Sequence, residues 1–400
     1  MSATLTQQYE TELPPFPVQS MQPVDPSGKK WPRSRVCLWQ GLTVSGLAKL
    51  LARRPSLSLS NLDRILSTVL VTGSNSLLNG LESLIWGRRI NNAQIEHAPV
   101  FLLGHWRSGT TMLHNLVTLN PRTTYMNLYQ CLFPGHFLLT EKVMGPLTEF
   151  LLPKTRPMDR IEVSWNMPQE DEMALAVSTL LSPYIMTAFH GRPEVYERYF
   201  DPQDMHPEER QRWEAAMLTL VRKMALLHDA PVVMKSPTHT FRIPALLKLF
   251  PNAKFVHIVR NPLAVFPSTI NLRKVMFTDN TLGELQPNVQ WEEAFRTYET
   301  CFRKYEAGKH LIPEGNLFEL KFEDLETRPV EMLRRMHHSL GLPGWEEAEP
   351  RVREAVAGFS GYRKNSYNID DNLREIITSR LRWVFDLYDY PLAEVQGVAA

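Results

Sequence analysis

The sequence contains few cysteines, and their positions exclude two kinds of structure. Only Cys37, Cys131 and Cys301 occur among 400 residues, and no two of them have the CxxC spacing of a zinc site or a redox pair. Scattered single cysteines are typical of a reduced compartment, where disulfides rarely persist. We therefore expect neither a disulfide framework nor a metal centre built on cysteine.

Long hydrophobic runs and a large charge of one sign are also absent. No stretch approaches the roughly 20 apolar residues of a membrane-spanning helix, and the N-terminus lacks the basic and apolar regions of a signal peptide. We therefore expect a cytoplasmic protein without a transmembrane segment. The formal net charge of +1 argues against nucleic acid as a partner, although it leaves room for one basic pocket.

A short apolar run that ends at Gly104, a loop that ends at Gly109 and a helical pattern that follows predict an anion site. The first amides of a helix have no partner inside it, and the helix dipole favours negative charge there. The loop is not the usual nucleotide-triphosphate motif, because Thr110 and Thr111 stand where that motif has Lys and Ser or Thr. Arg107 lies inside the loop instead. Taken alone, the stretch also fits a plain strand-to-helix turn with a stray arginine.

Strand and helix patterns alternate again from Pro231 onward, which indicates an α/β fold. Short apolar strands are predicted at 232–234, 253–259 and 316–322, and a helical pattern follows each one. Such alternation predicts a P-loop-like central parallel sheet with helices on both faces. Ligands bind these sheets at the carboxyl ends of the strands, which is where polar residues collect in this sequence.

The remaining segments predict additions to this α/β domain, which we place at 98–390 with a helical insert at about 120–229. Residues 1–40 are polar and rich in proline, and they indicate an extended arm. Residues 41–97 indicate a helical extension.

Within that extension we expect two amphipathic helices, over about 62–70 and 77–85, that pack their apolar faces on the body of the protein. A contact with a second copy or with a membrane surface is the alternative. A closing helix is expected at 371–387.

Candidates for a general base lie in the insert and after the predicted strand at 232–234. Glu170 and Glu172 belong to a run of three carboxylates among apolar residues, and such surroundings raise carboxylate pKa values as a base requires. A solvated helix start explains the same acids equally well. His239 follows Lys235 near the predicted strand end, and it is either a base or a histidine at a helix start.

Two motifs together resemble sulfotransferases that use 3′-phosphoadenosine 5′-phosphosulfate (PAPS). The RSGTT run after a strand resembles the loop that holds the 5′-phosphosulfate in that family. A strand followed by Arg260, Asn-Pro and then Ser268 resembles the motif that holds the 3′-phosphate. The segments GHWRSGTT, PxEDE and KSPTH are similar to those of the broad bacterial branch of the family. The resemblance covers roughly residues 99–387.

The resemblance implies roles for the residues that match these motifs. It implies that Arg107 stabilises charge on the bridging oxygen of the leaving phosphate and that Lys235 helps to orient the sulfuryl group. In several branches of the family the base is a Glu soon after the first motif's helix or a His after Lys-Thr, and this sequence departs from both patterns: residues 127–130 contain no carboxylate, and His239 stands two residues late. Glu170, Glu172 and His239 are therefore the candidates for the general base, with Glu170 slightly preferred. A basic C-terminal loop would close over the 3′-phosphate. The implied donor-binding residues are Arg107, Ser108, Gly109, Thr110, Thr111, Arg260, Ser268, Tyr362, Arg363 and Lys364.

The implied activity is transfer of a sulfuryl group from PAPS to a hydroxyl, or an amine, of a small or lipid-like acceptor. The product of the donor is 3′,5′-adenosine bisphosphate (PAP), and no metal is required. Two alternatives stay open: a nucleoside-phosphate kinase of related architecture, which the missing Gly-Lys-Ser/Thr disfavours, and a nucleotide-binding scaffold without catalysis. The arm and the helices of residues 1–97 are compatible with a homo-oligomer.

Overall fold

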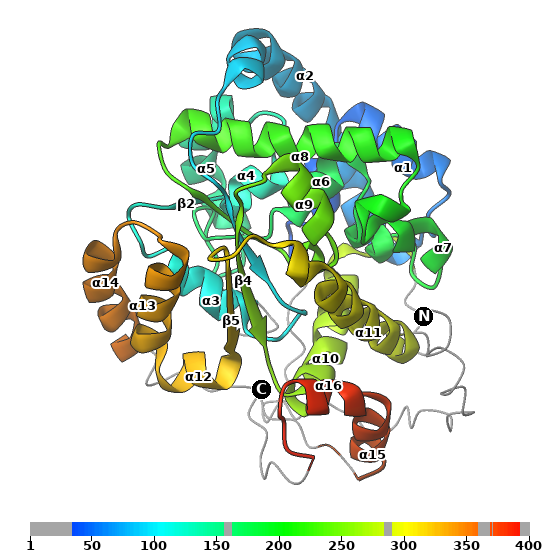
Figure 1. Cartoon of the computed structure of the whole chain (residues 1–400). Coiled ribbons are helices and arrows are strands. Elements are labelled where there is room, and N and C mark those ends of the chain that lie inside the picture. The colour runs from blue at the N-terminus through cyan, green and yellow to red at the C-terminus, as the bar shows by residue number, and fades with distance from the viewer. Residues whose placement is uncertain (1–33, 156–161, 284–289, 359–368, 370, 393–400) are drawn as a thin grey trace.

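The computed structural model describes residues 34–155, 162–283, 290–358, 369 and 371–392 (Figure 1). Five parallel strands form one sheet in the order β2-β3-β1-β4-β5. Their bounds are Val100–Leu103 for β1, Thr124–Tyr125 for β2, Val232–Lys235 for β3, Lys254–Val259 for β4 and Leu317–Lys321 for β5. The predicted α/β fold with a central parallel sheet is confirmed.

Strand β1 lies at the centre of the sheet because both of its faces are apolar. Val100 and Leu102 point into a core with α3 (Thr110–Val117) and α13 (Pro329–Leu340). Phe101 and Leu103 point into a second core with α8 (Pro207–Leu227) and α9 (Ile243–Leu249). Alternate residues of β1 therefore point to opposite faces of the sheet, and each set packs in a different core. Figure 1 shows α13 and α14 (Trp345–Gly358) on one side of the sheet and α11 (Gln290–Gly308) on the other.

The other helices surround these layers. A third core joins the end of β4 and α10 to α11 and to the helices near the C-terminus. The closing helix predicted at 371–387 is interrupted at Leu381 and forms two helices, α15 (Asp371–Arg380) and α16 (Arg382–Leu387). The remaining α-helices are α1 (Val44–Ala52), α4 (Leu128–Leu132), α5 (Phe137–Thr148), α6 (Glu172–Thr179), α7 (Pro193–Tyr196), α10 (Pro262–Asn280) and α12 (Phe322–Thr327).

Short 3-10 helices connect several of these elements. The segment between β2 and β3 is mostly helical and carries α4 to α8. The 3-10 helices are η1 (Leu38–Gly41), η2 (Leu59–Asn61), η3 (Glu149–Leu151), η4 (Pro183–Thr187), η5 (Glu197–Tyr199), η6 (Pro202–Asp204), η7 (Pro237–Phe241) and η9 (Lys309–Leu311). The described end of the predicted arm packs on the body, because Trp39 is buried and its Nε1 donates to the carbonyl of Asn280.

The expectation for residues 62–85 is wrong in two ways. One helix of 31 residues, α2 (Leu62–Asn92), replaces the two predicted helices. Its apolar side chains do not face the body: they are exposed, and the buried face is almost entirely polar. The exposed large apolar residues of α2 are Leu62, Leu66, Val69, Leu70, Leu77, Leu81, Leu84 and Ile85. Within the part of the chain that the structure describes, neither α2 nor any other helix is long and apolar enough to cross a membrane.

Candidate active site

The loop between β1 and α3 is held close to its neighbours by two glycines. Gly104 has φ +143, and a Cβ there would lie 2.5 Å from the carbonyl oxygen of Ile258. Gly109 has φ +99, and a Cβ there would collide with the ring of Phe322. Glycine alone tolerates both the left-handed backbone and the close approach. The loop is therefore a fixed backbone cradle rather than a loose turn.

The residues after Arg107 give this cradle its polar character. The Ser108 hydroxyl is buried and donates to the carbonyl of His105 at 2.7 Å, which closes the loop on itself. Gly109 is the N-cap of α3, so no side chain caps the first turn of that helix. Thr110 is buried and Thr111 is half-buried at the same turn. Uncapped first-turn amides together with the helix dipole form an anion-binding arrangement.

Two arginines bring the distant motifs together at the carboxyl ends of β1 and β4. Arg107 Nε donates to Ser268 Oγ at 2.7 Å. Arg260 Nη1 donates to the carbonyl of Arg107 at 3.4 Å, and its guanidinium lies 4.1 Å from the centre of the Phe322 ring. Arg260 is only 7% exposed, and burial lowers its pKa, which Glu323 partly offsets. The predicted juxtaposition of these residues is present in the structure.

A carboxylate, a lysine and a tyrosine meet at the end of β3. Lys235 Nζ donates to Glu170 Oε1 at 2.8 Å, and the Tyr184 hydroxyl donates to Glu170 Oε2. Trp106 Nε1 in turn donates to the Tyr184 hydroxyl at 3.4 Å. The Glu170 side chain is 19% exposed, whereas that of Lys235 is 2% exposed. Burial, and then the charge of Glu170, raise the pKa of Tyr184 well above its usual value, so this phenol keeps its proton.

The other two candidate bases are enclosed in the protein. Glu172 accepts from Arg242 Nη1 at 2.5 Å and from Nη2 at 3.0 Å, and both side chains have no exposed surface. His239 Nε2 lies 2.7 Å from Asp171 Oδ2, and its ring packs edge-on against another aromatic ring. Of the three predicted candidates, Glu170 is therefore the one with a surface that another molecule can reach.

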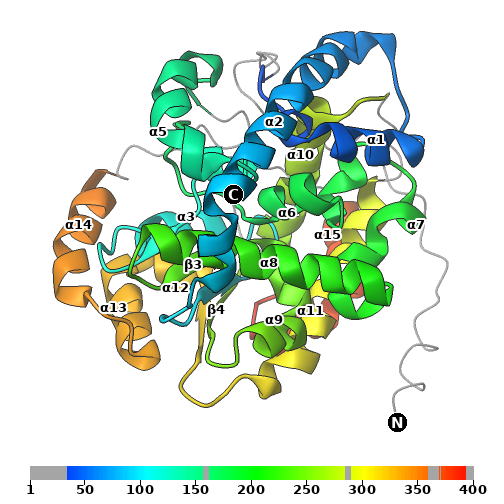
Figure 2. The same cartoon turned by 90° about the horizontal axis from the view of Figure 1, so that it is seen from above.

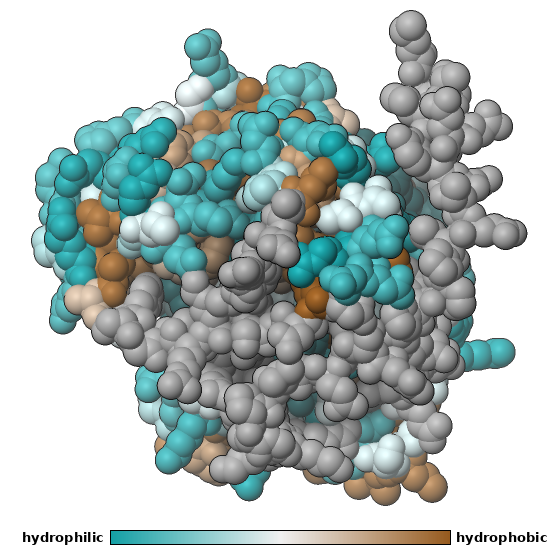
Figure 3. Space-filling view, turned by 90° about the horizontal axis from the view of Figure 1, so that it is seen from below, coloured by the Kyte–Doolittle hydropathy of each residue, from teal (hydrophilic) through white to brown (hydrophobic). Residues whose placement is uncertain are grey.

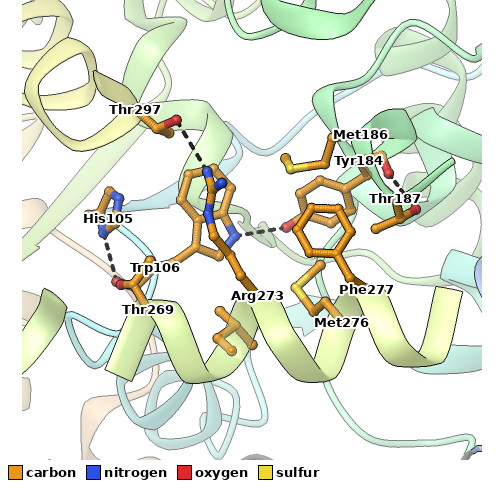
Figure 4. Close-up of a pocket in the computed structure, with 11 residues that line it drawn as sticks. His105, Trp106, Tyr184, Met186, Thr187, Thr269, Arg273, Met276, Phe277 and Thr297 are labelled. Carbon is orange, nitrogen blue, oxygen red and sulfur yellow. Dashed lines mark hydrogen bonds between the residues drawn. The ribbon is translucent and has the colours of Figure 1, made fainter. Parts of the chain in front are cut away.

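A pocket lies beside the cradle, between α10, η4 and the loop of residues 104–109 (Figure 4). It begins where the donor motifs end, because Trp106 precedes Arg107 and Thr269 follows Ser268. Most of its lining is apolar or aromatic. The lining residues are His105, Trp106, Tyr184, Met186, Thr187, Thr269, Leu272, Arg273, Met276, Phe277 and Thr297.

The polar groups of this pocket already have partners. Arg273 Nη1 donates to Glu293 Oε2 at 3.1 Å, and its Nη2 donates to Thr297 Oγ1 at 3.4 Å. His105 Nδ1 lies 2.8 Å from the carbonyl of Trp106, and burial lowers the pKa of His105 to about 3, so the ring is neutral. The pocket therefore presents an apolar wall and little unpaired charge.

Sequence reasoning missed the residues on the pocket side. Trp106 stands within the motif, directly before Arg107, and this position could have indicated that its side chain lies beside the anion site. Tyr184 and Arg273 carry no motif, and they reach the pocket only because η4 and α10 fold beside the loop. The predicted donor residues Tyr362, Arg363 and Lys364 lie outside the described residues.

Comparison with known proteins identifies the family. A sulfotransferase family model matches residues 99–347, which is more than half of the chain. The chain belongs to the sulfotransferase family. The predicted sulfotransferase activity is thereby confirmed. Among relatives of this sulfotransferase is the omega-hydroxy-beta-dihydromenaquinone-9 sulfotransferase Stf3 of Mycobacterium bovis. It is 36% identical over 362 residues, which cover 90% of this chain and 93% of that protein.

Two solved structures have the same fold as this sulfotransferase. Sulfotransferase STF9 from Mycobacterium avium has a TM-score of 0.67 and 18% identity, and the match covers 89% of this chain and 92% of that one. Sulfotransferase STF1 from Mycobacterium tuberculosis has a TM-score of 0.57 and 17% identity, with coverage of 84% and 89%. The match extends beyond the sheet to most of the surrounding helices.

Proposed function

We propose that this sulfotransferase moves a sulfuryl group from PAPS to a hydroxyl of an apolar, lipid-like acceptor and leaves PAP. The observation that carries the proposal is the direct junction of an anion cradle with an apolar pocket. Trp106 and Arg107 are consecutive, as are Ser268 and Thr269, and in each pair one residue belongs to the pocket and the other to the cradle. Donor and acceptor would therefore meet at this junction.

The cradle fits a donor that carries phosphate groups at both ends of its ribose. The amides of the α3 first turn and the loop held by Gly104 and Gly109 would receive the phosphosulfate. Arg260 and Ser268 would hold the 3′-phosphate, because a guanidinium binds phosphate oxygens through a bidentate fork. We assign Arg107, which contacts Ser268, to the bridging oxygen between phosphate and sulfur.

Glu170 is the group that we assign as general base. In the transfer step, the acceptor oxygen forms a bond to sulfur while the bond from sulfur to the phosphate oxygen breaks. The leaving oxygen keeps the electron pair, and the positive charge of Arg107 stabilises the negative charge that develops on that oxygen. The acceptor proton goes to Glu170. Lys235 and Tyr184, which each donate to one of its oxygens, hold the carboxylate in place.

Glu172 and His239 receive positioning roles in this proposal. Each is paired inside the protein, Glu172 with Arg242 and His239 with Asp171. A side chain without exposed surface cannot accept a proton from an acceptor in the pocket. Both pairs join the segment before and within α6 to the segment after β3, and they would hold Glu170 in position at the pocket.

The class of acceptor follows from the pocket and from a relative. Met186, Leu272, Met276 and Phe277 give the pocket an apolar wall suited to a hydrocarbon chain. The Mycobacterium bovis relative is named for a menaquinone derivative that carries an omega-hydroxyl group. We therefore propose an acceptor with a hydroxyl near the end of a long apolar chain.

Binding of PAP tests the donor site. In isothermal calorimetry we expect PAP to bind the parent protein and to bind Arg260→Ala about tenfold to a hundredfold more weakly, since a hydrogen bond to a charged group contributes about 1.5–3 kcal/mol. Arg334→Ala removes an exposed arginine that pairs with Glu349 away from the site, and its affinity should match that of the parent. Absence of binding to the parent, or equal binding to Arg260→Ala, would refute the assignment.

A further inference from the structure

Helix α2 presents its apolar side to solvent and its polar side to the protein. The exposed side carries leucine, valine and isoleucine residues over most of the helix length, with Leu70 at 80% and Leu84 at 83% exposed. The buried side carries Arg64, Asn75 and Glu82. This is the reverse of a helix that packs on a globular body, whose apolar stripe faces the core.

Specific polar contacts hold the helix in this orientation. Arg64 Nη1 donates to the carbonyl of Thr278 at 2.7 Å, and Asn75 Nδ2 donates to the carbonyls of residues 40 and 42 at 2.7 and 2.9 Å. Glu82 forms a buried ion pair with Lys223 and accepts from the backbone amide of Leu138 at 2.8 Å. Rotation that buried the apolar side would leave these groups without partners, at a free-energy cost for each one. Specific polar contacts therefore fix the orientation of α2 that exposes its apolar side.

The exposed surface is long and free of charge. Between Asp63 and Arg88 the only charged residues of α2 are Arg64 and Glu82, and both are buried. Helix α5 lies beside α2 (Figure 2) and adds Leu147 at 62% exposure, with further exposed apolar residues around it. Of the 19 exposed large apolar side chains in the described residues, 16 lie in residues 44–85 or 143–150.

This apolar surface is confined to one end of the molecule. Figure 1 shows α2 at the extremity opposite α15 and α16. The view from the side of α15 and α16 shows hydrophobic residues in small separate patches among hydrophilic ones, outside the part drawn in grey (Figure 3). Exposed apolar side chains gathered in this number at one end of a molecule mark an interaction site.

Charge distinguishes the partners that could cover this surface. Residues 44–92 contain six lysines and arginines and two acidic residues, a net charge of +4, whereas the whole chain carries +1. A second copy docked on the same face would bring two such basic segments together. An anionic lipid surface would complement them, because basic residues near such a surface attract it.

The surface is also connected to the acceptor pocket. Phe277 lines the pocket, and the next residue, Thr278, accepts the hydrogen bond from Arg64 of α2. The C-terminal end of α10 thus lines the pocket on one side and contacts the N-terminal turn of α2 on the other. A bilayer against the apolar side of α2 would therefore be linked to the pocket through the C-terminal end of α10.

We propose that α2 and α5 dock this enzyme on the surface of an anionic lipid bilayer. The helix lies in the plane of the membrane interface with its apolar side among the acyl chains, and its polar side stays attached to the protein. This inference goes beyond the transfer reaction: it names the surface on which the enzyme works.

Vesicle sedimentation with the full chain, without donor or acceptor, tests the proposal. The vesicles contain phosphatidylcholine alone or phosphatidylcholine with phosphatidylglycerol. We expect the parent to sediment with the anionic vesicles and to bind the neutral ones less. The double variant Leu70→Glu with Leu84→Glu should lose at least about tenfold in partition coefficient, since two exposed leucines no longer enter the apolar layer. Arg88→Ala should lower binding to anionic vesicles about fivefold and leave the neutral vesicles unaffected.

A matched control uses exposed leucines outside the docking surface. Leu311 and Leu387 are 49% and 44% exposed, and the double variant Leu311→Glu with Leu387→Glu should sediment like the parent. Light scattering on the parent should give the mass of one chain. Failure of the parent to bind vesicles, equal binding by the α2 variant, or a dimer that the α2 variant dissociates would overturn the proposal. PAP affinity, measured on the same variants, reports separately on the transfer site.

Discussion

Replacement of Glu170 by glutamine tests the assigned base most directly. Glutamine keeps the size of the side chain and one carbonyl oxygen, which can still accept from Lys235 Nζ, 2.8 Å away in the parent. Its amide nitrogen can donate to the Tyr184 hydroxyl, which rotates to accept. The variant therefore preserves the packing at the end of β3, and it removes the ability to take a proton together with the negative charge that pairs with Lys235.

The two effects of this change differ in size. A general base contributes about a hundredfold to ten-thousandfold to the rate, which corresponds to about 2.7–5.5 kcal/mol in the activation barrier. The structural cost is smaller: loss of the carboxylate that faces the Lys235 charge lowers the free energy of unfolding by about 1–3 kcal/mol, less than for a fully enclosed pair because the Glu170 side chain is 19% exposed. We expect kcat to fall at least about a hundredfold while the variant stays folded and binds PAP like the parent.

The assay follows PAP release from PAPS with dodecanol as a long-chain alcohol probe, in single-turnover experiments over a range of pH. Glu141→Gln is the matched control, because Glu141 also accepts side-chain hydrogen bonds from two residues, but these are Gln130 and Asn127 of the α4 start and not Lys235 and the pocket residue Tyr184. A rate within about tenfold of the parent, below any general-base effect, would show that Glu170 is not the base.

Three further changes have outcomes that the structure specifies. Gly109→Ala should weaken PAP binding in calorimetry by about tenfold or more, since a Cβ at φ +99 collides with Phe322 and shifts the loop. Glu172→Gln should lower the free energy of unfolding by about 3–5 kcal/mol, because it leaves the Arg242 charge buried without its carboxylate; an unchanged denaturation midpoint would contradict the enclosed pair. Burial lowers the pKa of His257 to about 3. Between pH 6.5 and 3 the unfolded state therefore binds more protons than the folded state, and the free energy of unfolding decreases as the pH is lowered through this range. Denaturation at pH 7.5 and 5 should show a loss of about 2 kcal/mol from this residue that His257→Phe removes.

The parallel sheet and the donor cradle could be predicted because their determinants are local. Strand β1 is wholly apolar, β3 and β4 are apolar for most of their length, and β5 keeps Leu317, Phe318 and Leu320 among its five residues, whereas β2 was missed because it has only two residues. The sequence alone could place Arg107 and Arg260 together, because parallel strands bring their carboxyl ends to one edge of the sheet. The prediction needed no knowledge of how the helices pack.

Helix α2 shows where the same reasoning fails. The 3.6-residue period reveals that one side of the helix is apolar, but not which side the protein covers. That choice depends on partners for Arg64, Asn75 and Glu82, which come from α10, from η1 and its following residue, and from α8. Polar pairs between distant segments leave no periodic trace in the sequence. An apolar stripe therefore predicts burial only if the opposite side has nothing to bind.

The three consecutive carboxylates of the insert illustrate how one of several equivalent residues becomes distinct. Glu170 pairs with Lys235, while Asp171 pairs with His239 and Glu172 with Arg242. In the sequence the three acids have the same surroundings, and only the folded chain encloses the last two pairs and leaves Glu170 partly exposed and in contact with Tyr184, which lines the pocket.

We expect the two inner pairs to act on the transfer reaction through the position of Glu170. Two buried pairs anchor the start of α6 to the segment after β3, and β3 adjoins β1, which carries the donor loop. A shift of residues 170–172 relative to the segment after β3 would therefore break both buried pairs as well as the contact between Glu170 and Lys235. Because breaking a buried pair is costly, we expect these pairs to fix the position of Glu170 relative to the loop of residues 104–109, and Asp171→Asn should lower kcat without a change in PAP affinity.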